Sequence, residues 1–114
     1  MRMPDRDEWG RDPSVQGMRK VFKAMETAQQ ELLERLDIQP YDLRIRRWRG
    51  KALALFERAW GIANQLGIAM DTATASAVYC SLLARIMGAE GIEVPEGLVP
   101  AGEEAARLIK EVFA

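Results

Sequence analysis

The strongest constraint on the fold is an apolar stripe that runs without a break through residues 42–68. Seven apolar side chains there recur at intervals of three and four residues: Ile45, Trp48, Ala52, Leu55, Ala59, Ile62 and Leu66. Residues at this spacing share one face of an α-helix, and Phe56, Trp60 and Ala63 broaden that face. The pattern predicts a long amphipathic helix over about 41–66, and we expect the other helices to pack around it.

The same spacing marks a first helix over about 13–36. Its apolar positions are Val15, Met18, Phe22, Met25, Leu32 and Leu36. Asp12 or Ser14 can cap the start, and Pro13 suits the first turn because a proline lacks the N–H that would be unsatisfied there. Residues 1–11 mix charges with proline and glycine, so we expect a loose arm.

Two more helices complete the expected fold. One spans about 71–90, with Asp71 as its cap, and its shortage of charge predicts burial on more than one side. The other spans about 100–113 and carries Glu103 in its first turn, where the helix dipole favours anions. No convincing strand is present. The chain of 114 residues is therefore predicted to be one all-α domain, a four-helix up-and-down antiparallel bundle.

Local signals indicate where these helices end. Pro40 cannot continue the first helix because it lacks a backbone N–H. Gly67 can adopt the left-handed conformation that closes a helix, with Ile68 packing back on the last turn. Residues 92–100 contain two prolines and a glycine, so we expect an extended loop rather than a helix, with its apolar residues laid over the core.

Three residues sit unexpectedly in these helices. Gly50 and Gly61 each destabilise a helix by about 1 kcal/mol relative to alanine. Close approach of another helix is the simplest reason for them, and a kink at Gly50 is the alternative. Gln29 interrupts the apolar face of the first helix. The spacing favours a position at the edge of that face, in reach of water, over a buried polar contact that fixes register.

The composition offers little for catalysis. The chain has no histidine, the usual general base. Its one cysteine, Cys80, lies mid-helix in an apolar setting, which is typical of a small buried residue rather than a nucleophile. The acids of the C-terminal third, Glu93, Glu96, Glu103 and Glu104, fit no metal motif and are interpreted as a solvated face. We therefore expect neither an enzyme nor a cofactor or metal site.

The location is inferred from what the sequence lacks. It contains no apolar run near the length needed to cross a bilayer, and its polar start does not resemble a secretory signal. A cytoplasmic protein without membrane contact is therefore expected.

The clearest functional signal is a run of cations at the start of the second helix. Its members are Arg44, Arg46, Arg47, Arg49, Lys51 and Arg58. Residues 44–58 hold six Lys/Arg against one Asp/Glu, a net charge of +5, whereas residues 59–114 hold three against seven, a net −4. Cations at a helix N-terminus oppose the helix dipole. A charge pattern that works against local stability is a reason to suspect a binding role.

Three interpretations of these cations remain open. They can pair with acids of the same chain, for which Glu31, Glu34 and Asp37 are candidates. They can bind an acidic protein surface, including a second copy of this chain, because arginine suits bidentate carboxylate contacts. They can also bind nucleic-acid phosphates, although the chain as a whole is slightly acidic, with a net charge of −1.

The sequence thus favours a non-enzymatic helical protein–protein interaction module, a homodimer or small subunit of a larger assembly. The alternative is a nucleic-acid-associated protein that contacts phosphates through residues 44–58. A third hypothesis, an enzyme or small-ligand binder, requires a closed pocket between the second and third helices, lined by Thr74, Tyr79 and Ser81.

Overall fold

The computed structural model describes residues 13–114, with side chains from Gly17 onward. It contains helices α1 (Pro13–Arg35), α2 (Arg44–Leu66), α3 (Thr72–Ala89) and α4 (Glu103–Val112), and a 3₁₀ turn, η2 (Glu96–Leu98). The predicted all-α fold of four antiparallel packed helices is confirmed. The predicted arm and the caps at Asp12 and Ser14 lie outside the described residues and side chains.

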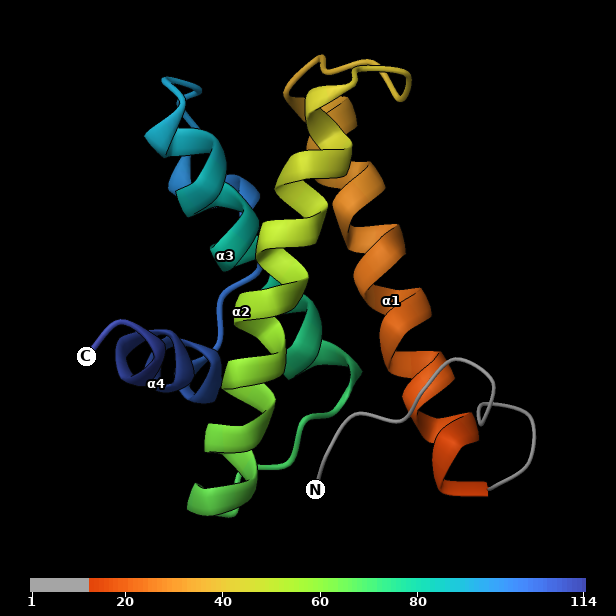
Figure 1. Ribbon diagram of the computed structural model, residues 1–114, viewed down its shortest axis with the longest axis vertical. Helices are drawn as coiled ribbons and strands as arrows, with labels where there is room; N and C mark the ends of the chain where they lie inside the picture. The colour runs from red at the N-terminus through yellow and green to blue at the C-terminus, as the bar shows by residue number, and fades with distance from the viewer. Residues whose placement is uncertain (1–12) are drawn as a thin grey trace.

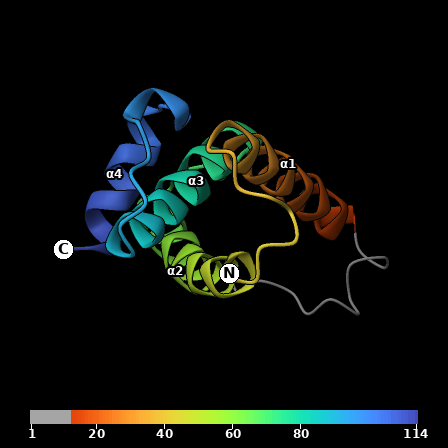
Figure 2. The same ribbon diagram turned by 90° about the horizontal axis from the view of Figure 1, so that it is seen from above.

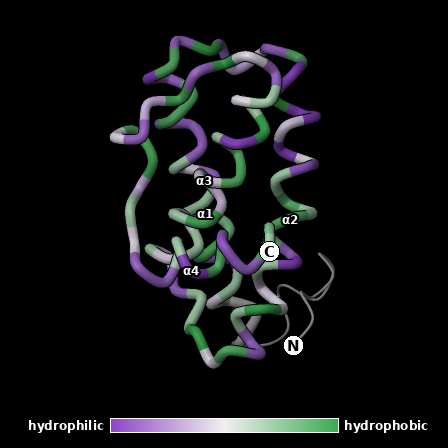
Figure 3. Tube along the Cα trace, turned by 90° about the vertical axis from the view of Figure 1, so that its left-hand side faces the viewer, coloured by the Kyte–Doolittle hydropathy of each residue, from purple (hydrophilic) through white to green (hydrophobic). Residues whose placement is uncertain are grey.

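The first three helices run along the long axis of the molecule in alternating directions. α1 ascends in Figure 1, α2 descends and α3 ascends again, whereas α4 is viewed nearly end-on. Seen from above, α3 lies between α1 and α4 (Figure 2). Along α2, hydrophilic and hydrophobic stretches alternate (Figure 3), as an amphipathic helix at a surface requires.

The central helix is α3, not α2 as the stripe led us to expect. α3 packs against α1, α2 and α4, whereas α2 packs closely against only α3 and α4. Four consecutive residues of α3, from Ala77 to Cys80, are buried. Because successive helical residues point roughly 100° apart, that run is surrounded on nearly all sides. The predicted burial of the third helix on more than one side is confirmed.

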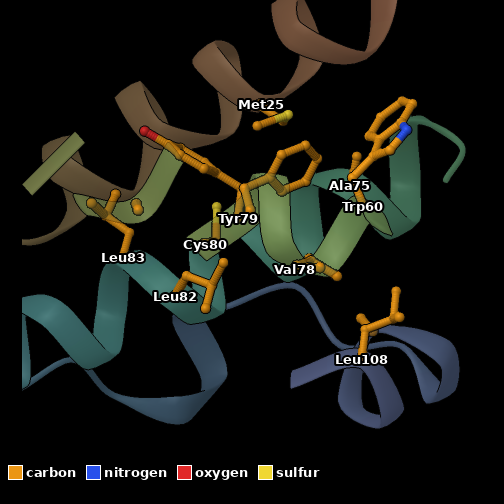
Figure 4. Close-up of a cluster of buried hydrophobic side chains, with 14 of the residues drawn as sticks. Met25, Trp60, Ala75, Val78, Tyr79, Cys80, Leu82, Leu83 and Leu108 are labelled. Carbon is orange, nitrogen blue, oxygen red and sulfur yellow. The ribbon is translucent and has the colours of Figure 1, made fainter. Parts of the chain in front are cut away.

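The core centres on Phe56 of α2, which is fully buried. Its ring meets those of Phe22, Trp60 and Tyr79 edge to face, with centroids 6.2, 6.0 and 6.5 Å apart, a favoured geometry for aromatic pairs. These large side chains fill the space between α1 and α2. Figure 4 shows Tyr79 reaching from α3 toward α1, while Leu108 of α4 lies on the opposite side of α3.

Two helix starts lie later than expected. α2 begins at Arg44 rather than about 41, and α4 begins at Glu103 rather than about 100. Before α2 the chain makes a turn closed by the Asp42 N–H on the Gln39 carbonyl, at 3.0 Å. Before α4, Gly102 is extended and acts as the N-cap. In both cases a few residues separate a proline from the start of the helix: a turn after Pro40 and an extended stretch after Pro100.

Three helices end in the same way. A residue with positive φ, at Asp37, Gly67 or Gly91, follows the last turn, and the next residue donates its N–H to a carbonyl five positions back at 2.9–3.0 Å. This is the Schellman geometry. The donating residue is always an isoleucine that packs against the core: Ile38, Ile68 and Ile92. The end predicted at Gly67 and Ile68 is confirmed; α1 ends before Pro40, because Asp37 already turns the chain.

The interpretations of three residues were wrong. A Cβ at Gly50 or Gly61 would meet no atom within 4 Å, apart from the helix's own backbone and chain neighbours. No neighbouring helix therefore approaches closely at either glycine. Gln29 does not reach water: it is 7% exposed, and its Oε1 accepts a hydrogen bond from the hydroxyl of Tyr79. The buried polar contact between α1 and α3 is therefore the correct alternative for Gln29.

The segment between α3 and α4 is largely extended, but it contains one 3₁₀ turn, η2. Pro95 precedes that turn, where its fixed φ is compatible with a helix start. The expectation of no helix there was thus too strict. The apolar residues of the segment pack against the core, as expected: Ile92, Val94, Leu98 and Val99.

Candidate protein interface

The first cation of α2 is held by a local carboxylate. Arg44 Nη2 lies 2.7 Å from Asp42 Oδ2, and the backbone N–H of Arg44 donates to Asp42 Oδ1 at 2.9 Å. The side-chain hydrogen bond from Arg44 is the main reason that the pKa of Asp42 falls from 3.8 to about 2. The guanidinium also lies over Trp48, 5.0 Å from the ring centroid, a cation–π contact.

A second carboxylate ties the start of α2 to the end of α3. Glu90 forms an ion pair with Arg47 through Oε1 and accepts the indole N–H of Trp48 on Oε2 at 2.7 Å. Partial desolvation pushes the pKa of Glu90 upward, but the hydrogen bonds from Trp48 and Arg47 outweigh it, so the net pKa is lowered. The wholly buried Trp48 ring thereby has its N–H satisfied.

The intrachain partners of the arginines are therefore not the predicted ones. Within the part of the chain that the structure describes, Glu31, Glu34 and Asp37 form no ion pair with the cations, whereas Asp42 and Glu90 do. Glu90 lies 43 residues from Arg47 in sequence, so only the packing of α3 against α2 brings them together. Sequence spacing alone contains no signal for that contact.

The remaining four cations form no ion pair with any residue in the range 17–114: Arg46, Arg49, Lys51 and Arg58. All four are exposed. They do not form one continuous track, because residues five apart in a helix, such as Arg46 and Lys51, point roughly 140° apart. The basic segment therefore presents two separate basic edges, with the exposed surface of α2 between them.

Two exposed apolar side chains lie immediately before these cations. Tyr41 is 79% exposed and Leu43 is 91% exposed. Leu43 has helical dihedral angles at the N-cap of α2, so Arg46 and Arg47, three and four residues later, are its neighbours on the helix surface. We name Tyr41 and Leu43 the α1–α2 tip; it lies at the top of Figure 1.

The tip was missed in the sequence because its two apolar residues come directly before the apolar stripe of the second helix. The stripe begins at Ile45, which packs partly buried against the core. Leu43 lies two residues earlier, which on a helix points it away from that face. An apolar residue off the stripe, beside unpaired arginines, is the signal that could have identified it.

The thiol of Cys80 and the phenol of Tyr79 are both buried. Burial raises the pKa of the Cys80 thiol to about 11 and is the main cause that raises the pKa of the Tyr79 phenol to about 12. Both groups are thus neutral near pH 7 and shielded from solvent. This agrees with Cys80 as a packing residue rather than a thiolate nucleophile.

Two of the three residues named by the small-ligand hypothesis, Tyr79 and Ser81, have different surroundings. Tyr79 is 2% exposed and fills the core. Ser81 instead lines an open hollow of about 610 Å³, which lies against α4 and the segment before it. We name this feature the α3–α4 hollow.

Two kinds of feature are absent from the described residues. In the range 13–114, no three or more cysteine, aspartate or glutamate side chains gather in a way that could hold a metal ion. Within the same range, no helix combines the length and the apolar character needed to cross a membrane.

Comparison with known proteins provides no relative from which a function could be inferred. No protein-family model matches the chain, and neither the curated proteins nor the solved structures include a significant match. The chemistry of the surface must therefore carry the functional argument. An exposed tyrosine and leucine, beside arginines, can supply apolar burial together with charged hydrogen bonds to a partner.

Proposed function

We propose that this protein is a non-enzymatic, cytoplasmic interaction module, and that the start of α2 and the α1–α2 tip form its binding surface. The supporting observation is the exposure of Tyr41 and Leu43 next to Arg46, a cation without an ion pair to the described residues. Tyrosine and arginine are enriched at protein interfaces. The partner surface is apolar at its centre and acidic at its rim.

The two internal ion pairs support this role by orienting the surface. Asp42 fixes the turn that carries the tip, through hydrogen bonds to the backbone and side chain of Arg44. Glu90 anchors the following turn of the helix to α3 through Arg47 and Trp48. A binding surface that is held in place before association loses less conformational entropy when it binds.

Nucleic-acid binding remains the second candidate, with weaker support. Two of the six cations are paired within the chain, and the other four face two edges of α2. Contact with several successive phosphates would need one continuous basic track, which this arrangement does not present. Fluorescence anisotropy with labelled duplex and single-stranded DNA and RNA at low salt tests this candidate: binding that weakens steeply with salt and is lost on Arg46→Glu/Arg49→Glu would favour it.

The proposed function is tested by asking whether any association depends on the tip. Size-exclusion chromatography with light scattering measures self-association, and affinity capture from the host after chemical cross-linking measures other partners. We expect a complex that is lost in Leu43→Ser/Arg46→Glu and retained in the control Ala54→Ser/Glu57→Gln. Those control residues are exposed on the same helix, away from the tip.

A wild-type monomer with no captured partner would contradict the proposal. A complex that survives Leu43→Ser/Arg46→Glu would contradict the assignment of the surface.

A further inference from the structure

The α3–α4 hollow has the complementary character to the α1–α2 tip. Its apolar lining comes from small or short side chains: Val99, Pro100, Ala101, Ala105 and Ala106. Two carboxylates, Glu96 and Glu103, also line it, and both residues are exposed. The hollow is thus an apolar depression with acids at its edge, whereas the tip is an apolar projection with arginines beside it.

The acids of the hollow are free to meet a partner. Neither Glu96 nor Glu103 forms an ion pair with any cation in the range 17–114. Glu103 lies in the first turn of α4, next to the exposed Ala106 one turn later. No large side chain of the hollow's own lining occupies it, because its residues other than the glutamates are valine, proline, serine, alanine and glycine.

A single chain cannot place its own tip in its own hollow. The tip lies in the α1–α2 connection at the top of Figure 1, whereas α4 and the segment before it lie on the other side of α2, against α3. The two features therefore lie on different elements, in separate parts of the molecule. Contact between them requires two molecules.

We propose that the tip of one copy inserts into the α3–α4 hollow of a second copy, and that the reverse contact forms at the same time. This inference rests on the proposed function, and it names the partner as a second copy of the chain. Tyr41 and Leu43 fill the hollow, while Arg46, which has no ion pair in the range 17–114, approaches Glu96 and Glu103. The segments carry opposite net charges, +5 over residues 44–58 and −4 over residues 59–114, which favours contact between unlike ends of two molecules.

The reciprocal arrangement follows from area and symmetry. One tip in one hollow buries less than the ~1,000 Å² expected of a specific interface. A two-fold dimer forms the contact twice, because in such a dimer a residue that touches a partner residue is matched by the reverse pair. The chain thereby gains two equivalent contacts from one pair of complementary features.

A mixing experiment with two surface variants tests this arrangement. The tip variant is Leu43→Ser/Arg46→Glu, and the hollow variant is Glu103→Lys/Ala106→Tyr. All four residues are exposed, so both variants should fold, which circular dichroism checks. A matched control, Ala54→Tyr/Glu57→Lys, makes the same kind of change elsewhere on α2.

Sedimentation velocity over a concentration series gives the association state. We expect the wild type and the control to dimerise, and each surface variant alone to weaken association by at least about 100-fold. An equimolar mixture of the two variants should form a 1:1 heterodimer, because one of its two contacts is intact and in the other the reversed charges of Arg46→Glu and Glu103→Lys attract each other. That rescue is specific to a contact between unlike surfaces.

Three results would overturn the inference, and they are distinguishable from failure of the proposed function. A wild-type dimer unaffected by the hollow variant would place self-association elsewhere. Loss of the dimer in both variants without rescue on mixing would exclude contact between tip and hollow. A wild type that stays monomeric would exclude the second copy as partner, while a tip-dependent partner captured from the host would still uphold the proposed function.

Discussion

Each half of α2 buries one tryptophan, but only one of the two indole N–H groups has a hydrogen-bond partner in the described residues. Trp48 in the first half is completely buried, and its indole donates to Glu90. Trp60 in the second half is 9% exposed, and its Nε1 is the buried side-chain polar atom of the described residues that has no hydrogen-bond partner. The first half is organised by a polar network and the second by aromatic packing.

The difference indicates that the two halves of α2 have different roles. In the second half, contacts between Phe56, Trp60 and their neighbours outweigh the desolvation of an unpaired N–H, which destabilises a protein by about 1–3 kcal/mol. In the first half, carboxylates hold Arg44 and Arg47, while apolar side chains remain exposed at the tip. The second half thus maintains the fold, and the first half presents a surface.

The largest expected effect separates the two halves directly. Phe56→Ala removes a fully buried ring that meets three other aromatic rings, so it should lower the free energy of unfolding by about 3–5 kcal/mol. Leu43→Ser changes an exposed side chain and should alter it by less than ~0.5 kcal/mol. Urea denaturation at a concentration where the chain is monomeric measures both, and equal losses would contradict the division.

The two tryptophans offer a closer comparison. Trp48→Phe removes a hydrogen bond to a carboxylate, whereas Trp60→Phe removes an N–H that has no partner. Both variants lose similar ring area, so Trp48→Phe should destabilise the protein by at least about 1 kcal/mol more than Trp60→Phe. Guanidinium denaturation of the two variants side by side provides the difference. The opposite order would mean that the indole of Trp60 is satisfied in solution.

Glycine substitutions test the geometry of α2 itself. Because a Cβ at Gly50 or Gly61 meets no atom outside the helix within 4 Å, alanine at either position should raise the free energy of unfolding by about 0.5–1 kcal/mol. Gly67 has a φ of +69°, so Gly67→Ala should lower it by about 1 kcal/mol. Thermal denaturation shows whether each variant is stabilised or destabilised. A destabilising Gly61→Ala would mean that another part of the protein lies close to Gly61.

The smallest effect concerns acid sensitivity of the first half. The pKa values of Asp42 and Glu90 are lowered in the folded protein, so each contributes stability above its unfolded pKa that is lost as the pH falls through its folded pKa. For Asp42 this window extends from 3.8 down to about 2. Asp42→Asn/Glu90→Gln should flatten the pH dependence of unfolding below pH 4 or so. An unchanged slope would assign the acid sensitivity to other carboxylates.

The sequence was sufficient for the features that depend on local pattern. Apolar spacing located the helices, and Asp71 was recognised as a cap; its Oδ1 accepts the Thr74 N–H at 2.8 Å. The sequence was insufficient to identify the central helix. A long apolar stripe indicates a helix with one buried face, whereas a helix that is buried on all sides has no such stripe. α3 was therefore recognised as buried but not as central.

The candidate interface was predictable only in part. The cations at the start of α2 were identified, but which of them are neutralised depends on Glu90, which reaches them through the packing of α3 against α2. The same limitation applies to the contact of Gln29 with Tyr79, across 50 residues of sequence. Contacts between helices require the relative placement of the helices, which single-sequence periodicity does not contain.

The central claim is that the first half of α2 and the α1–α2 tip form a docking surface, and site-specific photo-cross-linking tests it most directly. A benzophenone amino acid in place of Leu43 reports whichever surface lies against the tip, and mass spectrometry of the product identifies it. We predict a cross-link to residues 96–106 of a second copy, absent when the cross-linker replaces Ala54. No cross-linked product at position 43, in purified protein and in the host, would contradict the claim.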